Sequence, residues 1–322
     1  MAAFIIARAE SGVNVAEVLR RRLGLSRSKV GKLMQQRRIF LNGKPCLRAE
    51  GRVKHGQRLE VREPITKEKK QAADGPVIRY VDGQVVIVEK PAGLTTMRHA
   101  EEVSEFGARA QRFLPPTLAD LLPSLLAKTS PGNRLQVRAV HRLDKETTGL
   151  VVFARTVAAE SNLGRQFRAH STERCYRAIV RGRAKAGRIE SCLVRDRGDG
   201  RRGSSTQPGQ GQRAVTHVHI LEELGDYTLV ECRLETGRTH QLRIHLGESG
   251  TPICGERVYD RPVHGKPIPD KSGATRLALH AASLGFDHPE TGKRMTWHSP
   301  LPRDLQDLLA RLRKSVRGSP GQ

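Results

Sequence analysis

The sequence has few of the features that mark disulfide-rich, zinc-binding, secreted or membrane proteins. Its five cysteines stand singly along 322 residues, without the close pairs that a zinc ribbon or a thioredoxin-like redox site needs. No apolar run approaches the roughly 20 residues of a membrane span, and the opening Met-Ala-Ala-Phe-Ile-Ile is too short and too soon charged for a signal peptide. These absences predict a cytoplasmic protein whose cysteines are reduced and serve in packing.

Signatures of cofactor and metal binding are also missing. There is no glycine-rich phosphate loop and no dinucleotide fingerprint, so we expect no nucleotide cofactor. Four histidines invite a metal interpretation: His141, His240, His245 and His280. None has the i, i+4 partner and intervening acid of a zinc hydrolase, so we predict that they bind no metal and instead hydrogen-bond to backbone around a pocket.

The chain carries a large excess of positive charge. Lysine and arginine total 57 against 33 acidic residues, a formal net charge of +24, and residues 11–62 alone hold 14 basic and 3 acidic residues. Such a field attracts phosphate backbones, so nucleic acid is the expected partner, with a merely basic protein as the alternative. The length suits one sizeable catalytic domain and a small appended one.

The amino-terminal part has the pattern of a small helical unit with a hairpin. Apolar residues recur at helical spacing over 15–23 and again after Ser26, a candidate helix cap. Residues 38–41 and 58–61 favour strands, and Asn42-Gly43 is a dipeptide typical of tight turns.

This unit resembles the RNA-binding domain shared with ribosomal small-subunit protein S-four. The resemblance rests on S-R-S-K-V-G-K-L-M at 26–34, I-F-L-N-G-K at 39–44 and G-Q-R-L-E-V at 56–61. It implies an RNA-binding domain over residues 11–62, in which the second helix and the following loop form a basic surface. The residues implied in RNA binding are Arg27, Lys29, Lys32, Arg37 and Arg38. A solvated basic helix face remains the alternative.

The rest of the chain predicts a linker and a mixed α and β domain. Residues 63–75 are charged and lack apolar periodicity, as expected of a linker before a domain over 76–315. The expected strands are Val77–Tyr80, Val85–Glu89, Leu150–Ala154, Tyr176–Val180, Thr216–Leu221 and Tyr227–Leu234. The expected helices are Val157–Arg168 and Asp304–Arg313. Segment 98–134, which is mixed and partly helical, and segment 198–212 suggest inserts or mobile loops, the second suited to RNA contact or equally to an inert loop.

The most informative stretch is H-R-L-D-K-E-T-T-G-L at 141–150, which places polar residues between apolar segments. By itself it allows a local ion pair between Arg142 and Asp144 at a turn. The other motifs are V-E-K-P-A-G-L at 88–94, E-R-C-Y-R-A-I-V-R-G at 173–182, L-E-T-G-R-T-H-Q-L-R-I-H-L at 234–246 and R-L-A-L-H-A-A-S-L-G-F-D-H-P-E-T-G at 276–292. In this order and spacing they resemble the pseudouridine synthases of the Rlu family, which modify ribosomal and transfer RNA.

The resemblance implies an α/β fold built on a bent, largely antiparallel mixed sheet flanked by helices. It places the nucleophilic aspartate at Asp144 and the basic partner of that aspartate at Arg243. Arg142 is implied to enter the space that the flipped uridine leaves, and Tyr176 to lie against the uracil ring. The residues further implied in substrate binding or in the pocket wall are His141, Leu242 and Ile244.

The chemistry of pseudouridine formation fits these roles. The bond from the base to the anomeric carbon breaks, the base turns, and it rejoins through carbon 5, which requires a nucleophile and a sealed pocket for an extruded base. A bidentate arginine would keep a buried carboxylate charged, and Arg243 fits that need. Whether Asp144 attacks the anomeric carbon, attacks carbon 6 or removes a sugar proton stays open at this point.

Two other function classes are compatible with parts of the pattern. A non-catalytic RNA-binding factor for ribosome assembly would have no need for Asp144 together with Arg243. A base-excising glycosidase would want a second carboxylate beside the nucleophile. We expect a monomer acting on structured RNA, with ribosomal RNA favoured over transfer RNA.

Overall fold

The structure is a computed structural model that describes residues 2–35, 39–46, 51–61, 75–98, 114–129, 136–207, 209–263 and 265–317. The chain divides into two compact units, Met1–Ala72 and Ala73–Gln322. Nearly all of the expected linker lies outside the described residues, as do Arg37, Arg38 and parts of the 98–134 segment. Within the described ranges, no helix is long and apolar enough to cross a membrane.

The described part of the smaller unit combines two α-helices and a short 3₁₀ helix (Arg8–Glu10) with a small sheet. Its α-helices are α1 (Val15–Leu23) and α2 (Arg27–Gln35), and its sheet has the order β1-β4-β2-β3. The strands are β1 (Ala2–Ile5), β2 (Ile39–Leu41), β3 (Lys44–Pro45) and β4 (Arg58–Val61). The sequence analysis began this domain at residue 11 and so did not predict β1, which pairs antiparallel with β4. Asn14 caps α1 by accepting a hydrogen bond from the Glu17 amide at 2.7 Å.

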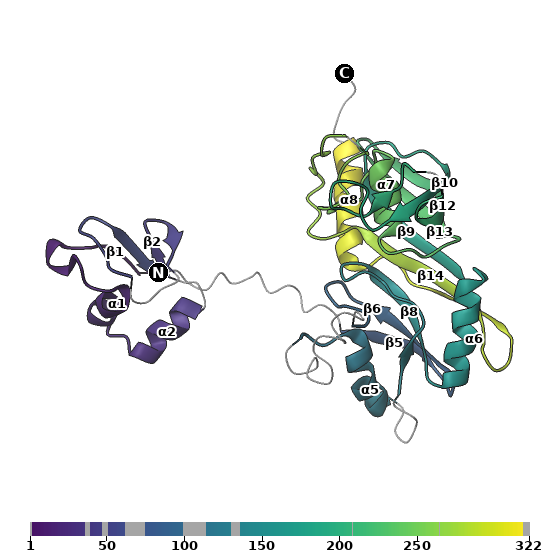
Figure 1. Ribbon diagram of the computed structural model, residues 1–322, viewed down its shortest axis with the longest axis horizontal. Helices are drawn as coiled ribbons and strands as arrows, with labels where there is room; N and C mark the ends of the chain where they lie inside the picture. Colours follow the sequence, from purple (N-terminus) through teal and green to yellow (C-terminus); the bar gives the residue numbers. More distant parts are fainter. Residues whose placement is uncertain are drawn as a thin grey trace. The chain divides into compact units, whose positions relative to one another are not determined.

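The larger unit is built on one extended sheet (Figure 1). Its order is β11-β10-β12-β13-β9-β14-β8-β6-β5, with β15 paired to β14 and β7 paired to β8. The strands are β5 (Val77–Val81), β6 (Val85–Lys90), β7 (Arg138–Ala139), β8 (Thr148–Ala154), β9 (Glu173–Arg181), β10 (Gly187–Val194), β11 (Gly203–Ser204), β12 (Gln212–Leu224), β13 (Tyr227–Leu234), β14 (Leu279–Asp287) and β15 (Arg294–His298). Only the β14–β8 pair is parallel among the described pairs. The predicted mixed α/β class with a largely antiparallel sheet is therefore confirmed.

Within the described residues of this unit, four helices accompany the sheet: α5 (Leu118–Thr129), α6 (Val157–Arg168), α7 (Gln241–Glu248) and α8 (Arg303–Arg317). The sequence predicted α6 at the same bounds and most of α8, because each has a one-sided apolar stripe. It did not predict α7, which is buried at most of its positions and therefore shows no amphipathic pattern. Strand β14 was also missed, since its Ala, Ser and Gly residues have low strand propensity.

The segment 198–212 differs from the mobile loop suggested by its composition. Two of its residues form β11, which pairs with β10. The Arg197 side chain is only 6% exposed and bridges Asp199 and Glu248, each at 3.0 Å. The Ser204 hydroxyl donates to Glu248 at 2.6 Å. Composition cannot reveal these contacts, because Glu248 lies 44 residues beyond Ser204.

Candidate active site

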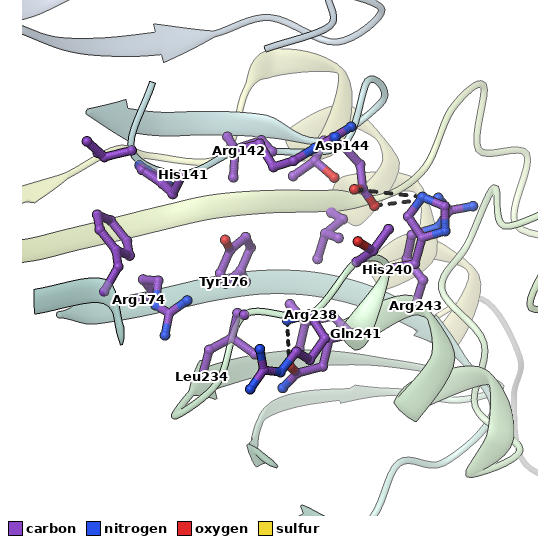
Figure 2. A pocket seen from close by; sticks show the side chains of 18 of the residues that line it. His141, Arg142, Asp144, Arg174, Tyr176, Leu234, Arg238, His240, Gln241 and Arg243 are labelled. Carbon is purple, nitrogen blue, oxygen red and sulfur yellow. Dashed lines mark hydrogen bonds and ion pairs between the residues drawn. The ribbon is translucent and has the colours of Figure 1, made fainter. Parts of the chain in front are cut away.

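A cavity of about 430 Å³ lies in the larger unit, where three distant segments meet beside Leu279 at the start of β14. Its walls come from the turn that precedes β8, from the end of α6 with the start of β9, and from residues 234–243 with the first turn of α7. Figure 2 shows Asp144 and Arg243 facing each other at one end, and His141 with Arg174 at the other. Tyr176 lies between the two ends.

The Asp144 turn is held by backbone hydrogen bonds on both sides. The Thr147 amide donates to the Asp144 carbonyl at 3.1 Å. The buried Thr96 hydroxyl donates to the Leu143 carbonyl at 2.8 Å, and the Leu143 amide is 3.1 Å from the same hydroxyl oxygen. Leu143 itself is 3% exposed and anchors the turn in the hydrophobic core. The carboxylate of Asp144 is thus presented at the cavity by a fixed backbone.

Lys90, the lysine of V-E-K-P, stabilises the same turn through hydrogen bonds from its ammonium group. Its side chain is fully buried, and its ammonium donates to the carbonyls of Pro91, Leu94 and Lys145 at 2.9, 2.8 and 3.1 Å. Burial lowers the pKa of Lys90 to about 7, against the opposing effect of nearby Glu146. Lys90 therefore joins the strand β6 to the residue that follows Asp144.

We expect Lys90→Met to lower the free energy of unfolding of the larger unit by about 3 kcal/mol, because three buried carbonyls lose their donor. Urea denaturation followed by the fluorescence of Trp297, the single tryptophan, measures this unit specifically. Lys293→Met, at an exposed position, is the control and should be nearly neutral. Equal stability of the two variants would contradict the support role of Lys90.

Arg243 is fixed mainly by Glu256. Its Nε and Nη2 donate to the two Glu256 oxygens at 2.6 and 2.9 Å, while its Nη1 lies 3.5 Å from Asp144 Oδ2. The Glu256 side chain is fully buried, and it also accepts hydrogen bonds from the backbone amides of residues 257 to 259. The expectation of a bidentate pair between Arg243 and Asp144 was thus wrong for this structure. One nitrogen is left for the aspartate because the other two face Glu256.

His240 and Tyr259 complete this end of the cavity. His240 begins α7 with a left-handed backbone (φ 59°), and its Nδ1 lies 2.7 Å from the Tyr259 hydroxyl. Its Nε2 lies 3.9 Å from Asp144 Oδ1. The Arg243 guanidinium sits over the Tyr259 ring, 5.1 Å from its centroid. Burial lowers the pKa of His240, and the charge of Arg243 adds to this effect while Asp144 opposes it.

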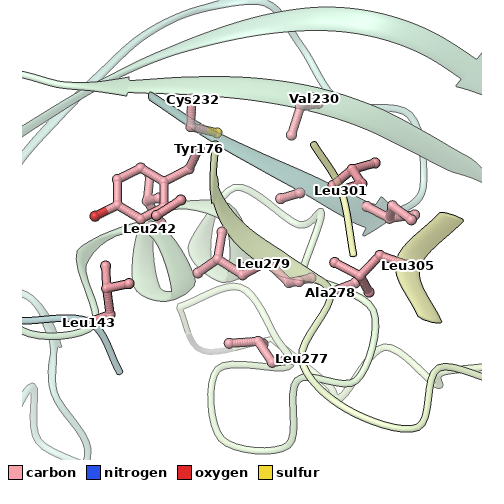
Figure 3. Close-up of a cluster of buried hydrophobic side chains, with 14 of the residues drawn as sticks. Leu143, Tyr176, Val230, Cys232, Leu242, Leu277, Ala278, Leu279, Leu301 and Leu305 are labelled. Carbon is pink, nitrogen blue, oxygen red and sulfur yellow. The ribbon is translucent and has the colours of Figure 1, made fainter. Parts of the chain in front are cut away.

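Tyr176 forms the apolar floor between the two charged ends. It is 9% exposed, and burial raises the pKa of its hydroxyl to about 12. Figure 3 shows its ring beside Leu242 in the main hydrophobic cluster, which also contains Leu143 and Leu279. A protonated phenol on a packed support offers an aromatic face and one hydrogen-bond donor, and it does not serve as a base at neutral pH.

Comparison with known proteins shows which family has this arrangement of motifs. The family described as RNA pseudouridylate synthase matches residues 84–248. Ribosomal large subunit pseudouridine synthase D of Neisseria meningitidis serogroup B is 34% identical over 297 residues, which are 89% of this chain and 75% of that protein. The chain belongs to the RNA pseudouridylate synthase family. The Bacillus subtilis protein named uncharacterized RNA pseudouridine synthase YlyB is 34% identical over 296 residues, 90% of each chain.

The fold of the synthase agrees with this assignment. The solved structure of human RNA pseudouridylate synthase domain containing 4 superposes with a TM-score of 0.58 at 26% identity, covering 73% of this chain and 92% of that one. The predicted activity, an isomerase that converts uridine to pseudouridine in RNA, is confirmed by these relatives.

The synthase brings together most, but not all, of the residues that the sequence implied for its pocket. Asp144, Tyr176 and Arg243 line the cavity, and so do the other residues His141, Arg142 and Leu242. Ile244 does not line it and is fully buried in a separate cluster with Leu193, Ala214 and Tyr259. Successive residues of a helix are rotated by about 100°, so Leu242 and Ile244 point in nearly opposite directions.

The histidines of the synthase have mixed partners. His141 Nε2 accepts from the Val152 amide at 3.0 Å, a backbone contact as predicted. His280 Nε2 lies 3.2 Å from the Ser299 carbonyl, also as predicted, but its Nδ1 lies 2.9 Å from the Thr148 hydroxyl. His240 and His245 instead contact side-chain hydroxyls, His245 those of Thr216 and Ser191. The described part of the chain contains no cluster of three or more side chains that could hold a metal ion.

We expect acid to destabilise the larger unit of the synthase through His245 and His280. Both are fully buried, and burial lowers the pKa of each to about 4. The unfolded chain binds protons at these sites below pH 6.5 while the folded one does not, so stability is complete above pH 6.5 and falls toward pH 4. At pH 5 each contributes a loss of about 2 kcal/mol.

The measurement is urea denaturation monitored by Trp297 between pH 7.5 and 5. The double variant His245→Gln/His280→Gln should reduce the loss of stability between pH 7.5 and 5 by about 4 kcal/mol, with a remainder from His141, whose pKa burial lowers to about 3. His219→Gln, at an exposed position, should leave the pH dependence unchanged. An unchanged slope in the double variant would contradict the assignment.

Sequence reasoning missed Glu256, Tyr259 and Arg174 in the site. Glu256 and Tyr259 fall in C-G-E-R-V-Y, between two of the recognised motifs, and carry no spacing signal of their own. The only available hint was that a buried arginine such as Arg243 needs an acidic partner. Arg174 stands two residues before Tyr176 on β9 and donates to the Glu235 carbonyl at 2.9 Å.

The residues implied in RNA binding by the smaller unit are only partly described. Lys29 is exposed on α2. Its amide donates to the hydroxyl of Ser26, the residue just before the helix, at 3.2 Å. The side chains of Arg27 and Lys32 lie outside the described residues, together with Arg37 and Arg38.

Proposed function

We propose that this synthase converts uridines of large-subunit ribosomal RNA to pseudouridine, with Asp144 as the nucleophile. The observation that carries the proposal is the juxtaposition of Asp144, Arg243 and Tyr176 in one cavity of about 430 Å³. The substrate follows from the relatives, since the Neisseria meningitidis protein is named a ribosomal large subunit pseudouridine synthase.

The charge arrangement suits a carboxylate nucleophile. Arg243 Nη1 lies 3.5 Å from Asp144, and its positive charge favours the ionised carboxylate in a partly buried site. Because Glu256 binds the Nε and Nη2 edge of the guanidinium, Arg243 cannot rotate to form hydrogen bonds with both oxygens of Asp144. An oxygen of Asp144 is therefore left to approach the substrate.

The rest of the cavity suits a flipped uridine. The base would lie on the Tyr176 ring, whose hydroxyl keeps its proton at neutral pH, and the apolar wall around Leu242 would retain the detached uracil while it turns. Arg142 is exposed at the cavity and would enter the space that the base leaves in the RNA. The smaller unit, with Lys29 and its basic neighbours, would bind RNA near the modified site.

Pseudouridine mapping by carbodiimide-dependent reverse-transcription stops on total RNA tests the proposal. Cells lacking the protein and cells carrying Asp144→Ala should lose the same stops in large-subunit ribosomal RNA, while Asp226→Asn, a matched exposed position, should keep them. Retention of every stop with Asp144→Ala would reject the nucleophile. Loss of stops only in other RNA classes would reject the proposed substrate.

A further inference from the structure

A second cavity, of about 590 Å³, adjoins the catalytic one. It lies where β10 ends, and its walls include Arg195, Arg202, Gln210, Gln212 and Thr239. Thr239 also lines the catalytic cavity and directly precedes His240, so the two cavities share a wall. A substrate longer than one nucleotide can therefore occupy both.

The wall of this second cavity is tied to the helix that carries Arg243. Glu248, in the last turn of α7, accepts hydrogen bonds from the Arg197 guanidinium at 3.0 Å and from the Ser204 hydroxyl at 2.6 Å. Its side chain is 10% exposed, and that of Arg197 is 6% exposed. Helix α7 thus sets the position of both Arg243 and the segment 195–204.

The arginines around this cavity fall into two groups. Arg197 pairs with Asp199 and Glu248, and Arg213 pairs with Glu190 at 2.6 Å. Across the described ranges of the chain, Arg195 and Arg202 have no acidic or hydrogen-bonding partner, and both line the cavity. Two uncompensated cations at one concave site favour an anionic ligand.

The acid in the same wall, Asp196, offsets only part of this charge, because two arginines stand against one carboxylate. One oxygen of Asp196 is engaged by the amides of Gly198 and Gly200, at 2.8 and 2.9 Å, where it closes a turn. The charge of Arg202 also reaches the catalytic end, because it contributes, after burial and Arg243, to lowering the pKa of His240.

We propose that this cavity binds a phosphate of the RNA strand next to the flipped uridine. Arg195 and Arg202 would neutralise the phosphate, while Gln210, Gln212 and Thr239 offer hydrogen bonds to the adjoining sugar. The proposal rests on the proposed function, since it assumes that the uridine in the first cavity belongs to a longer RNA strand. The site would contribute to substrate affinity and leave the chemical step to Asp144.

The test compares Arg195→Ala/Arg202→Ala with Arg183→Ala/Lys185→Ala in steady-state assays. The control removes two exposed cations beyond the opposite end of β10, about 26 Å away at 3.3 Å per residue. The substrate is a transcript of large-subunit RNA that contains a mapped uridine. We expect the cavity variant to raise KM about tenfold with kcat unchanged, and to flatten the dependence of log KM on log salt by about 1.

Three outcomes would contradict the proposed phosphate site. These are an unchanged KM, an equal rise in the control variant, or a fall in kcat without a change in KM. If the wild-type synthase makes no pseudouridine in this transcript, the proposed ribosomal substrate fails, and the subsite is then judged by the Kd for the same RNA. A Kd that is weakened in the cavity variant and unchanged in the control would still support the phosphate site, and equal Kd values would reject it.

Discussion

Asp144→Asn is expected to lower kcat for pseudouridine formation by at least about 10⁴-fold, the scale on which loss of a nucleophile acts. Asparagine keeps the size and the turn, because the hydrogen bonds that hold residues 143 to 147 are made by backbone groups and Thr96. It removes the charge that faces Arg243 and the oxygen that would attack the substrate. Single-turnover assays with saturating RNA measure the effect.

The binding of RNA separates this catalytic loss from misfolding. The Kd of the Asp144→Asn variant for RNA should stay within about threefold of the wild-type value, because phosphate contacts dominate affinity. Asp226→Asn, at an exposed turn between β12 and β13, is the matched control and should retain full kcat. A kcat for Asp144→Asn within tenfold of wild type would require another nucleophile.

Glu256→Gln is expected to lower kcat about 100-fold while RNA affinity changes little. The amide cannot hold the Arg243 guanidinium in a charged bidentate pair, so Arg243 becomes free to turn onto Asp144 and cover its oxygens. Breaking this buried pair also costs about 3 to 5 kcal/mol of stability. Kinetics must therefore be measured at a temperature where Trp297 fluorescence shows that the larger unit is folded.

A double-mutant cycle distinguishes positioning from general destabilisation. If Glu256 acts through Arg243, then adding Glu256→Gln to Arg243→Met should reduce kcat little further, because the group that Glu256 positions is already gone. Multiplicative losses in kcat would contradict this coupling. An unaltered kcat in Glu256→Gln alone would show that the Asp144 oxygens stay accessible without the pair.

Helix α7 links the catalytic cavity to the second cavity through residues at its two ends, which its sequence pattern does not reveal. The left-handed His240 starts the helix, Arg243 projects into the cavity, and Glu248 fixes the segment 195–204 at the other end. A shift of α7 would therefore displace Arg243 in the catalytic cavity and residues 195–204 beside the second cavity at the same time.

Sequence patterns predicted the elements that have a clear apolar stripe or a run of β-branched residues. Helix α6 keeps its polar face in solvent, and strand β13 was predicted at its observed bounds. Burial on both faces did not by itself hide a strand, since β8 is buried throughout and was predicted from its run of Val and Leu, whereas β14, with its Ala, Ser and Gly residues, and the short helix α7 were missed. The Ile244 prediction failed for the same reason, since its direction depends on α7 being a helix.

The sequence by itself determined the family, the activity and the position of the H-R-L-D turn, because these follow from residue types in a fixed order. It also indicated an RNA partner through its net charge of +24. Only the tertiary structure decided that Arg243 is held by Glu256, that Ile244 faces away and that Glu248 anchors residues 197 and 204. Those contacts join segments far apart in the chain, and their geometry depends on how the sheet and α7 pack together.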